Sequence, residues 1–236
     1  MGEMVRYERE GKVGVIVLDH PPFNAYSNVF HADLQEAWEA GRDDPEARVL
    51  VMLGKNKHFC GGASMRAEDH REEPRPHDAV AFFELVKGIM KPTIAAVHGA
   101  CLGGGQRFVF PCDMIFCSPD AYFRDPTVDF GIGGIQSHLH TWFYGPRLAR
   151  EMIFTGEPIP AERLYAMGMV NRIIPREHLH EETMAVAAKI AERPALPLRQ
   201  AKRASIITMD IQGQHYITHR FAELLDEAPV FNLPRS

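Results

Sequence analysis

Two glycine-containing stretches hold the residues whose types and spacing suit chemistry. Three consecutive glycines, Gly103 to Gly105, come where an apolar run (93–98) passes toward a helical pattern. Glycines at a strand-to-helix turn let the backbone approach a ligand closely and point successive N–H groups at it. A second glycine loop, HFCGGAS (58–64), follows the preceding apolar run. Because neighbouring parallel strands end at one edge of a sheet, we expect both loops to converge on one point.

The two loops could bind a phosphate or a developing oxyanion. The phosphate interpretation is weak, because no G-K-[ST] follows the glycines and the spacing G-x-G-x-x-G does not occur here. An oxyanion site needs a second N–H donor, which HFCGGAS can supply. Tight backbone packing is the alternative that spacing alone leaves open.

Side chains that could transfer protons follow the glycines. Arg107 cannot act as a general base, because its pKa lies above about 12. Asp125 and Asp129 flank Thr127, and one of them could pair with Arg107, which would keep that carboxylate ionised and lower its pKa. A salt bridge without catalytic use is the alternative. The intrinsic pKa of histidine suits proton transfer near neutrality, so His138, at the expected start of a helix, could also transfer a proton or simply be hydrogen-bonded.

A histidine pair near the end of the chain has the spacing of metal ligands. His215, His219 and Glu223 share one helical face. The chain has 12 histidines, and no general base stands between this pair, so a solvated or interface face is the preferred interpretation. The sequence therefore predicts no metal.

The composition favours one large domain or a main domain with a small appendage. The chain has 236 residues, is 45% hydrophobic and carries a formal net charge of -5. It has no basic footprint for nucleic acid or an anionic membrane, and no apolar run of membrane-spanning length. The charged start MGEMVRYERE does not resemble a signal or transit peptide. We expect the four cysteines to be buried and reduced, and the protein to be cytoplasmic.

Elements that would position these residues alternate along the first half of the chain. Short β-branched or apolar runs predict strands, and 3.6-residue patterns predict helices, the first of them capped by Ser27 or Asn28. The charged, Pro-containing stretch 66–77 predicts an exposed loop. Later segments read as helices around one apolar run, VNRII (170–174). The predicted strands are 13–18, 48–53, 93–98 and 114–117, and the predicted helices are 27–41, 79–90, 146–155, 161–168, 177–192, 197–209 and 213–227. This order predicts a parallel α/β core over 1–195 and a helical C-terminal region over 196–236.

Several motifs, in order, resemble the crotonase superfamily of enoyl-CoA hydratases and isomerases. They are LDHPPFNAYSNVF, HFCGGAS, KPTIAAVHGACLGGG, PCDMIFCSPDAYF and IFTGEPIPAERLYAMGMVNRIIP, and the likeness spans roughly residues 10–205. The resemblance implies a spiral of β-β-α turns with a helical trimerisation region. It also implies an acyl-CoA thioester as substrate, with coenzyme A as part of that substrate and no permanently bound cofactor. The expected assembly is a homotrimer or a dimer of trimers.

The same resemblance assigns roles to residues of this chain. It implies that the backbone N–H groups of Ala63 and Gly104 hold the thioester oxygen. The positions it implies at the CoA-binding loops are Asn24, Ala25, Gly61, Gly62, Ala63 and Gly103. His20 stands where many members have an arginine, which would weaken a CoA phosphate contact, and the C-terminal region is shorter than usual.

The chain departs from the family at its two catalytic glutamates. Arg107 stands at the first position and Thr127 at the second. Paired carboxylates activate water in the hydratases, so a non-standard acid/base is expected here, with Asp129, His138 and Arg107 as candidates. The main hypothesis is an acyl-CoA enzyme that stabilises a thioester enolate. A catalytically silent acyl-CoA-binding protein is the alternative, and a purely structural subunit is a third possibility.

Overall fold

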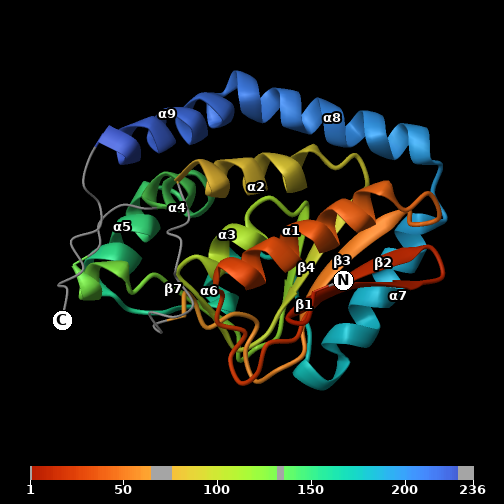
Figure 1. The fold of residues 1–236 in the computed structure, drawn as a ribbon, viewed down its shortest axis with the longest axis horizontal. Coiled ribbons are helices and arrows are strands. Elements are labelled where there is room, and N and C mark those ends of the chain that lie inside the picture. Colours follow the sequence, from red (N-terminus) through yellow and green to blue (C-terminus); the bar gives the residue numbers. More distant parts are fainter. Residues whose placement is uncertain (1, 65–75, 132–135, 228–236) are drawn as a thin grey trace.

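The computed structural model describes residues 2–64, 76–131 and 136–227 and contains a mixed sheet covered by helices (Figure 1). The sheet has the strand order β1-β2-β3-β4-β6-β9. Strand β1 is antiparallel to β2, and the other neighbours are parallel. The strands are β1 (Val5–Glu10), β2 (Val13–Leu18), β3 (Val49–Gly54), β4 (Thr93–Val97), β6 (Met114–Cys117) and β9 (Arg172–Ile173).

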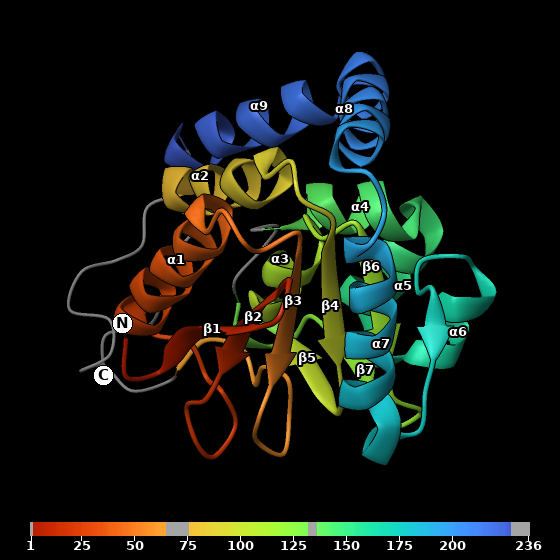
Figure 2. The same cartoon turned by 90° about the vertical axis from the view of Figure 1, so that its right-hand side faces the viewer.

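Strand β2 shows why the central strands are so apolar. All six residues of VGVIVL are buried, because helices cover both faces of the sheet. Ile16 and Leu18 pack in the cluster that holds α1 (Asn28–Asp43), whereas Val15 and Val17 pack in the cluster that holds α7 (Leu179–Ala191). Figure 2 shows these two helices on opposite sides of the sheet.

Helix α1 confirms the predicted amphipathic pattern. Its buried residues are Phe30, Leu34, Ala37, Trp38 and Gly41. The Ser27 hydroxyl caps it by accepting from the Phe30 N–H at 3.2 Å, a contact typically worth about 1 kcal/mol. This cap ends the loop that follows β2 and so sets where that loop lies.

A second, smaller sheet was not predicted. It consists of β5 (Ala100–Leu102), β7 (Tyr122–Arg124) and β8 (Ile159–Pro160). Isolated parallel bridges join Cys60 to Cys101 and Tyr26 to Ala63, so the loops after β2 and β3 lie beside this sheet. Strands of two or three residues are too short to show an alternating pattern, which is why the sequence did not reveal them.

The remaining helices agree with the predictions to within a few residues. Helices α8 and α9 run across the top of Figure 1, with α2 beneath α9. Residues 66–75 of the predicted exposed loop lie outside the described residues, and its last two residues begin α2 instead. The helices are α2 (Pro76–Gly88), α3 (Gly105–Val109), α4 (Ser137–Tyr144), α5 (Pro146–Thr155), α6 (Ala161–Ala166), α8 (Ala195–Ile211) and α9 (Gln214–Glu227), and the short 3-10 segments are η2 (Thr127–Phe130) and η3 (Arg176–His178).

Two partly buried ion pairs attach helix α8 to the core. Lys202, the one buried residue of α8, donates to Asp113 Oδ2 at 2.8 Å. At the end of the same helix, Asp210 Oδ1 accepts from Lys87 of α2 at 2.6 Å. Among the described residues, none of the helices combines the length and apolarity needed to cross a membrane.

Candidate active site

The two glycine loops meet as the sequence predicted, at the edge where β2, β3 and β4 end. The Tyr26 N–H donates to Gly62 O at 2.9 Å, and the Ser64 N–H donates to Tyr26 O at 2.8 Å. The Cys60 N–H, in the loop after β3, donates to Ala100 O at the start of β5 at 3.0 Å. These bonds connect the loops after β2, β3 and β4 into one surface.

The backbone amides of Ala63 and Gly104 are among those of this surface that have no backbone acceptor within the described residues. Within the described part of the chain, neither the Ala63 nor the Gly104 N–H donates to a carbonyl, although Gly103 beside them donates to Arg124 O at 2.8 Å. Ala63 is exposed, and its neighbours on both sides are used in the bridge to Tyr26. A ligand oxygen between the two loops could therefore accept from both amides.

A different physical constraint favours glycine at each position of the triplet. Gly103 has φ +47°, a left-handed conformation that favours glycine. A Cβ on Gly104 would lie 2.1 Å from the Tyr26 hydroxyl oxygen, and one on Gly105 would lie 2.8 Å from Cys60 Sγ. Close backbone packing, the alternative that the spacing left open, is therefore one reason why glycines occupy these positions. It coexists with the free amide of Gly104.

Arg107 points to Tyr26 rather than to a carboxylate. Its Nη2 donates to the Tyr26 hydroxyl at 3.3 Å, and its guanidinium carbon lies 5.7 Å from the centre of that ring. Arg107 Nε is buried and has no hydrogen-bond partner among the described residues. Burial raises the pKa of Tyr26, so the side chain is a neutral phenol at ordinary pH. A phenol that accepts from Arg107 keeps its own proton available for a ligand.

Gln106, next to Arg107, is a structural residue. Its side chain is buried, donates to Arg124 O at 3.0 Å and accepts from the Tyr144 hydroxyl at 2.8 Å. The first contact ties α3 to β7 and the second ties it to α4. This amide therefore holds the helix that carries Arg107 in place.

The two predicted aspartates have different surroundings, and neither forms the suggested pair with Arg107. Asp129 is 46% exposed and pairs with Arg124 at 2.6 Å, on the side of η2 that faces Gly156. Asp125 is buried, and its carboxylate accepts from the Thr127 N–H at 3.0 Å. The buried carboxylate of this region is thus Asp125, not the residue expected to be the base.

Asp125 belongs to a small buried polar cluster under the site. Its Oδ2 accepts from Gln136 Nε2 at 3.2 Å and lies 3.7 Å from His140 Nδ1. Burial lowers the pKa of His140 despite the nearby carboxylate, so the imidazole is neutral near pH 7. The cluster links α4 to the segment before η2.

His138 lines a pocket between α4 and α9. Its ring stacks on Phe221 of α9 with centres 4.2 Å apart. The pocket has a volume of about 440 Å³ and is lined by Ser137, His138, Thr141, Trp142, Ile217 and Phe221. Burial lowers the pKa of His138 to about 3, helped by repulsion from His140 once that imidazole is protonated and by the positive charge of Arg107. The imidazole is therefore a neutral hydrogen-bonding group at the wall of a mostly apolar pocket. Residues 132–135 of the predicted turn before it lie outside the described residues.

The predicted CoA-loop residues form a framework around the amides. Asn24 is buried with φ +52°, and its side-chain oxygen accepts from His20 N–H at 2.7 Å and Asn56 Nδ2 at 2.8 Å. Its Nδ2 donates to the carbonyls of His58 and Phe59. Asn24 therefore fastens the first loop to the second, with its hydrogen-bonding capacity used inside the protein.

The other CoA-loop positions lie along the same bridge. The Gly61 N–H donates to Phe23 O at 2.8 Å, and Gly62, with φ +90°, accepts from Tyr26 through its carbonyl. Ala25, half-buried, lies between Asn24 and Tyr26. Gly103 contributes the left-handed turn. These backbone contacts explain why small residues occupy the loops.

Tyr26 is the residue of this site that sequence reasoning missed. It lies just before the cap of α1 and reads as part of a loop motif. Its hydroxyl reaches Arg107, 81 positions away in the chain, only because the Tyr26–Ala63 bridge holds it over the glycine triplet. A pattern within a short window carries no signal for that contact.

Comparisons with known proteins match the chain along most of its length. A family model described as enoyl-CoA hydratase/isomerase matches residues 8–226. A crotonyl-CoA hydratase of Syntrophomonas wolfei is 30% identical over 213 residues, which cover 86% of this chain and 81% of the relative. A carnitinyl-CoA dehydratase of Salmonella arizonae is 30% identical over 229 residues, which cover 92% and 87%.

Solved structures show the same fold. The crystal structure of a probable enoyl-CoA hydratase from Mycobacterium thermoresistibile superposes with a TM-score of 0.85 at 36% sequence identity. The match covers 93% of this chain and 94% of that one. The arrangement of the two sheets and the C-terminal helices is therefore shared with a solved protein along nearly the whole chain.

Proposed function

Because the chain belongs to the enoyl-CoA hydratase/isomerase family, we propose that it binds an acyl-CoA thioester between its two glycine loops. The N–H groups of Ala63 and Gly104 would hold the thioester oxygen and stabilise the enolate that forms from it. The observation that carries this proposal is the pair of amides without a backbone acceptor on adjoining loops. Coenzyme A enters as part of the substrate.

The acid/base would be Tyr26, assisted by the positive charge of Arg107, in place of the two glutamates. The guanidinium puts a positive charge beside the oxyanion hole, where it favours an enolate. In the protonation step, the Tyr26 O–H would give its proton to the enolate α-carbon, whose electron pair forms the new C–H bond. The phenolate left behind would be paired with Arg107, which already donates to that oxygen at 3.3 Å.

The two other acid/base candidates, Asp129 and His138, transfer no proton in this proposal. The Asp129 carboxylate is paired with Arg124 at 2.6 Å, which directs it to that side chain rather than to the glycine loops. His138 would line the acyl side as a neutral group, because its pKa of about 3 leaves it without a proton to give as an imidazolium. The proposal thus assigns bond-making to Tyr26 and acyl contact to His138.

A silent acyl-CoA-binding protein is the second candidate. The replacement of both glutamates, by Arg107 and Thr127, favours it. The two candidates share the oxyanion amides and differ only in turnover. A measurement of binding alone therefore cannot separate them.

The test is a crotonyl-CoA hydration assay, followed by loss of the conjugated thioester absorbance, with CoA-ester binding measured on the same sample. A panel of neutral and carboxylate-bearing acyl-CoA esters follows under the same conditions. Turnover of any member supports the enzyme, and the panel then identifies its acyl group. Binding without turnover throughout would establish the silent protein. Absence of binding to every ester would overturn both.

We also propose the homotrimer or dimer of trimers that the family resemblance implies. Helix α8 exposes Leu196, Ile207 and Ile211, the last with 82% of its surface accessible. Exposed apolar residues on one element mark a surface suited to association. Light scattering during size-exclusion chromatography measures the mass directly. A monomeric mass at micromolar concentration would contradict this assembly.

A further inference from the structure

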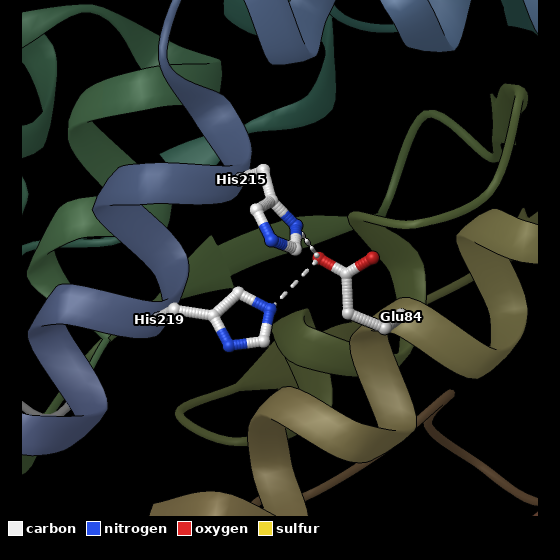
Figure 3. Close-up of side chains that lie close together, drawn as sticks. All are labelled: Glu84, His215 and His219. Atoms are coloured by element: carbon white, nitrogen blue, oxygen red, sulfur yellow. Dashed lines mark ion pairs between the residues drawn. The ribbon is translucent and has the colours of Figure 1, made fainter.

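Helices α2 and α9 bring two histidines and one glutamate together outside the candidate active site. His215 and His219 lie one turn apart on α9, and Glu84 of α2 points at both of them (Figure 3). Glu84 Oε1 lies 3.5 Å from His215 Nδ1 and 3.8 Å from His219 Nε2. We propose that these three side chains bind a late first-row divalent cation, with Zn²⁺ as the best-matched ion.

The spacing of the three donor atoms suits such an ion. A tetrahedral zinc site with bonds of 2.0–2.1 Å separates its ligand atoms by about 3.4 Å. The three atoms here all lie within 4.8 Å of one another, so small side-chain rotations bring them to bonding distance. Two imidazoles and one carboxylate form a donor set that zinc uses when one position stays open to water. The histidines are 57% and 47% exposed, which leaves room for that water.

The carboxylate oxygen at the centre of the cluster lacks a hydrogen-bond donor among the described residues. Glu84 Oε1 is buried and has no hydrogen-bond partner among the described residues. A buried carboxylate oxygen without a partner is costly, and a cation bound there would remove that cost. One ring nitrogen of each imidazole faces this oxygen. An ion bound beside the oxygen would therefore be within reach of both nitrogens, and each imidazole would bind it in the neutral form.

Other charges around the site leave it favourable to a cation. Lys87 Nζ lies 3.9 Å from Glu84 Oε1, but it is held at 2.6 Å by Asp210. Lys87 and Asp210 offset each other, which leaves the charge of Glu84 for the ion. A cation between the histidines would approach from the solvent side.

The composition of the site differs from what the sequence indicated. Glu223 shares the helical face of the two histidines but pairs with Arg220 at 2.7 Å. The third ligand comes instead from Glu84, on another helix. The sequence-based expectation of no metal rested on the 12 histidines of the chain and on the lack of a general base between this pair, with Glu223 as the third residue considered.

The ion would connect the C-terminal helix to the core. Ile217, between the two histidines, and Phe221, shortly after them, line the pocket that holds His138. A metal that joins α9 to α2 would therefore fix one wall of that pocket. This role is independent of the proposed chemistry at Gly104.

The experiment uses full-length protein without a polyhistidine tag, stripped with a chelator and dialysed. Zn²⁺ is titrated by calorimetry, and Co²⁺ is added as a spectroscopic probe of coordination geometry. We expect one equivalent of Zn²⁺, a rise in melting temperature and the visible absorption of low-coordinate Co²⁺. In His219→Ala and in Glu84→Gln, affinity should fall by at least about 10–100-fold. His178→Ala is the matched control, because His178 is also exposed and also lies near a carboxylate, Glu181.

Two outcomes would overturn the proposal. The first is wild-type protein that binds Zn²⁺ no more tightly than His219→Ala does. The second is Co²⁺ that shows only the weak spectrum of the hydrated ion in wild-type protein, a result that needs no variant to fold. Acyl-CoA turnover plays no part in either readout, so the two proposals fail separately.

Discussion

The hydroxyl oxygen of Tyr26 lies against the α-carbon of Gly104, so closely that a Cβ there would sit 2.1 Å from it. This contact joins the loop after β2 to the glycine triplet that follows β5. Arg107 completes it by donating to the same oxygen at 3.3 Å. A polar group thus stands beside the amide of Gly104, which has no backbone acceptor among the described residues.

Gly104→Ala should destabilise the protein, because the added methyl group overlaps the phenol ring of Tyr26. Overpacking of this kind typically costs about 1–3 kcal/mol. Thermal unfolding measures the effect. Gly88→Ala is the control, since a Cβ there meets nothing within 4 Å. The second variant Tyr26→Ala should recover much of the loss when combined with Gly104→Ala. A stable Gly104→Ala protein with an unmoved Tyr26 would contradict the contact.

Tyr26→Phe should lower turnover of the substrate that the panel identifies by about 100-fold or more, since it removes one positioned proton donor. Binding of the CoA ester should change little, because the two amides remain. Tyr7→Phe also removes a phenolic hydrogen bond, to Asp44 at 2.7 Å, but far from the glycine loops. Equal turnover in the two variants would exclude Tyr26 from the chemistry.

Asp125→Asn should cost more stability than Asp129→Asn. The Asp125 carboxylate is buried and accepts from two donors, so an amide there leaves a donor facing a donor, at about 1–3 kcal/mol. The exposed pair of Asp129 with Arg124 should be worth at most about 1 kcal/mol. Chemical denaturation of both variants gives the comparison. A hundredfold loss of turnover in Asp129→Asn, in a stable protein, would restore its role as the base.

Stability should fall as the pH drops below about 6.5. The pKa of His138 is near 3 in the folded protein, against its usual 6.5, and that of His140 is also lowered. Between these values the unfolded chain binds more protons, so acidification favours unfolding by at most about 1.4 kcal/mol per pH unit for each histidine. Melting temperatures from pH 7 to pH 4.5 test this. His138→Gln should show a smaller decline, and an unchanged slope would show that this histidine does not contribute.

The four cysteines should resist alkylation in the native protein. All four are buried, and burial raises their thiol pKa values, to about 12 for Cys60. A thiol that is both protonated and covered reacts slowly. Iodoacetamide labelling followed by mass spectrometry should find all four modified only after unfolding. Rapid native labelling of Cys60, next to Gly105, would reveal an accessible site.

Local patterns in the sequence were enough for much of the fold. The apolar run VGVIVL predicted a buried strand, and the helical face from Phe30 to Gly41 predicted α1 with its Ser27 cap. These features depend on neighbours within one or two turns, which a short window contains. The ordered motifs predicted the family and its fold, and the comparisons confirm both. They also predicted that the loops carrying Ala63 and Gly104 meet.

Only the tertiary structure decided which side chains face one another. It assigned Arg107 to Tyr26 rather than to an aspartate, and it placed Glu84 rather than Glu223 beside His215 and His219. Such contacts join residues on separate loops or helices, and they depend on how bridges and helix packing orient each element. The sequence determined by itself the central parallel strands, most of the helices, the family and the positions of the glycine loops. Which charged and aromatic side chains contact one another could be learned only from the fold. These contacts act through space between residues far apart in the sequence, so no periodic pattern along the chain predicts them.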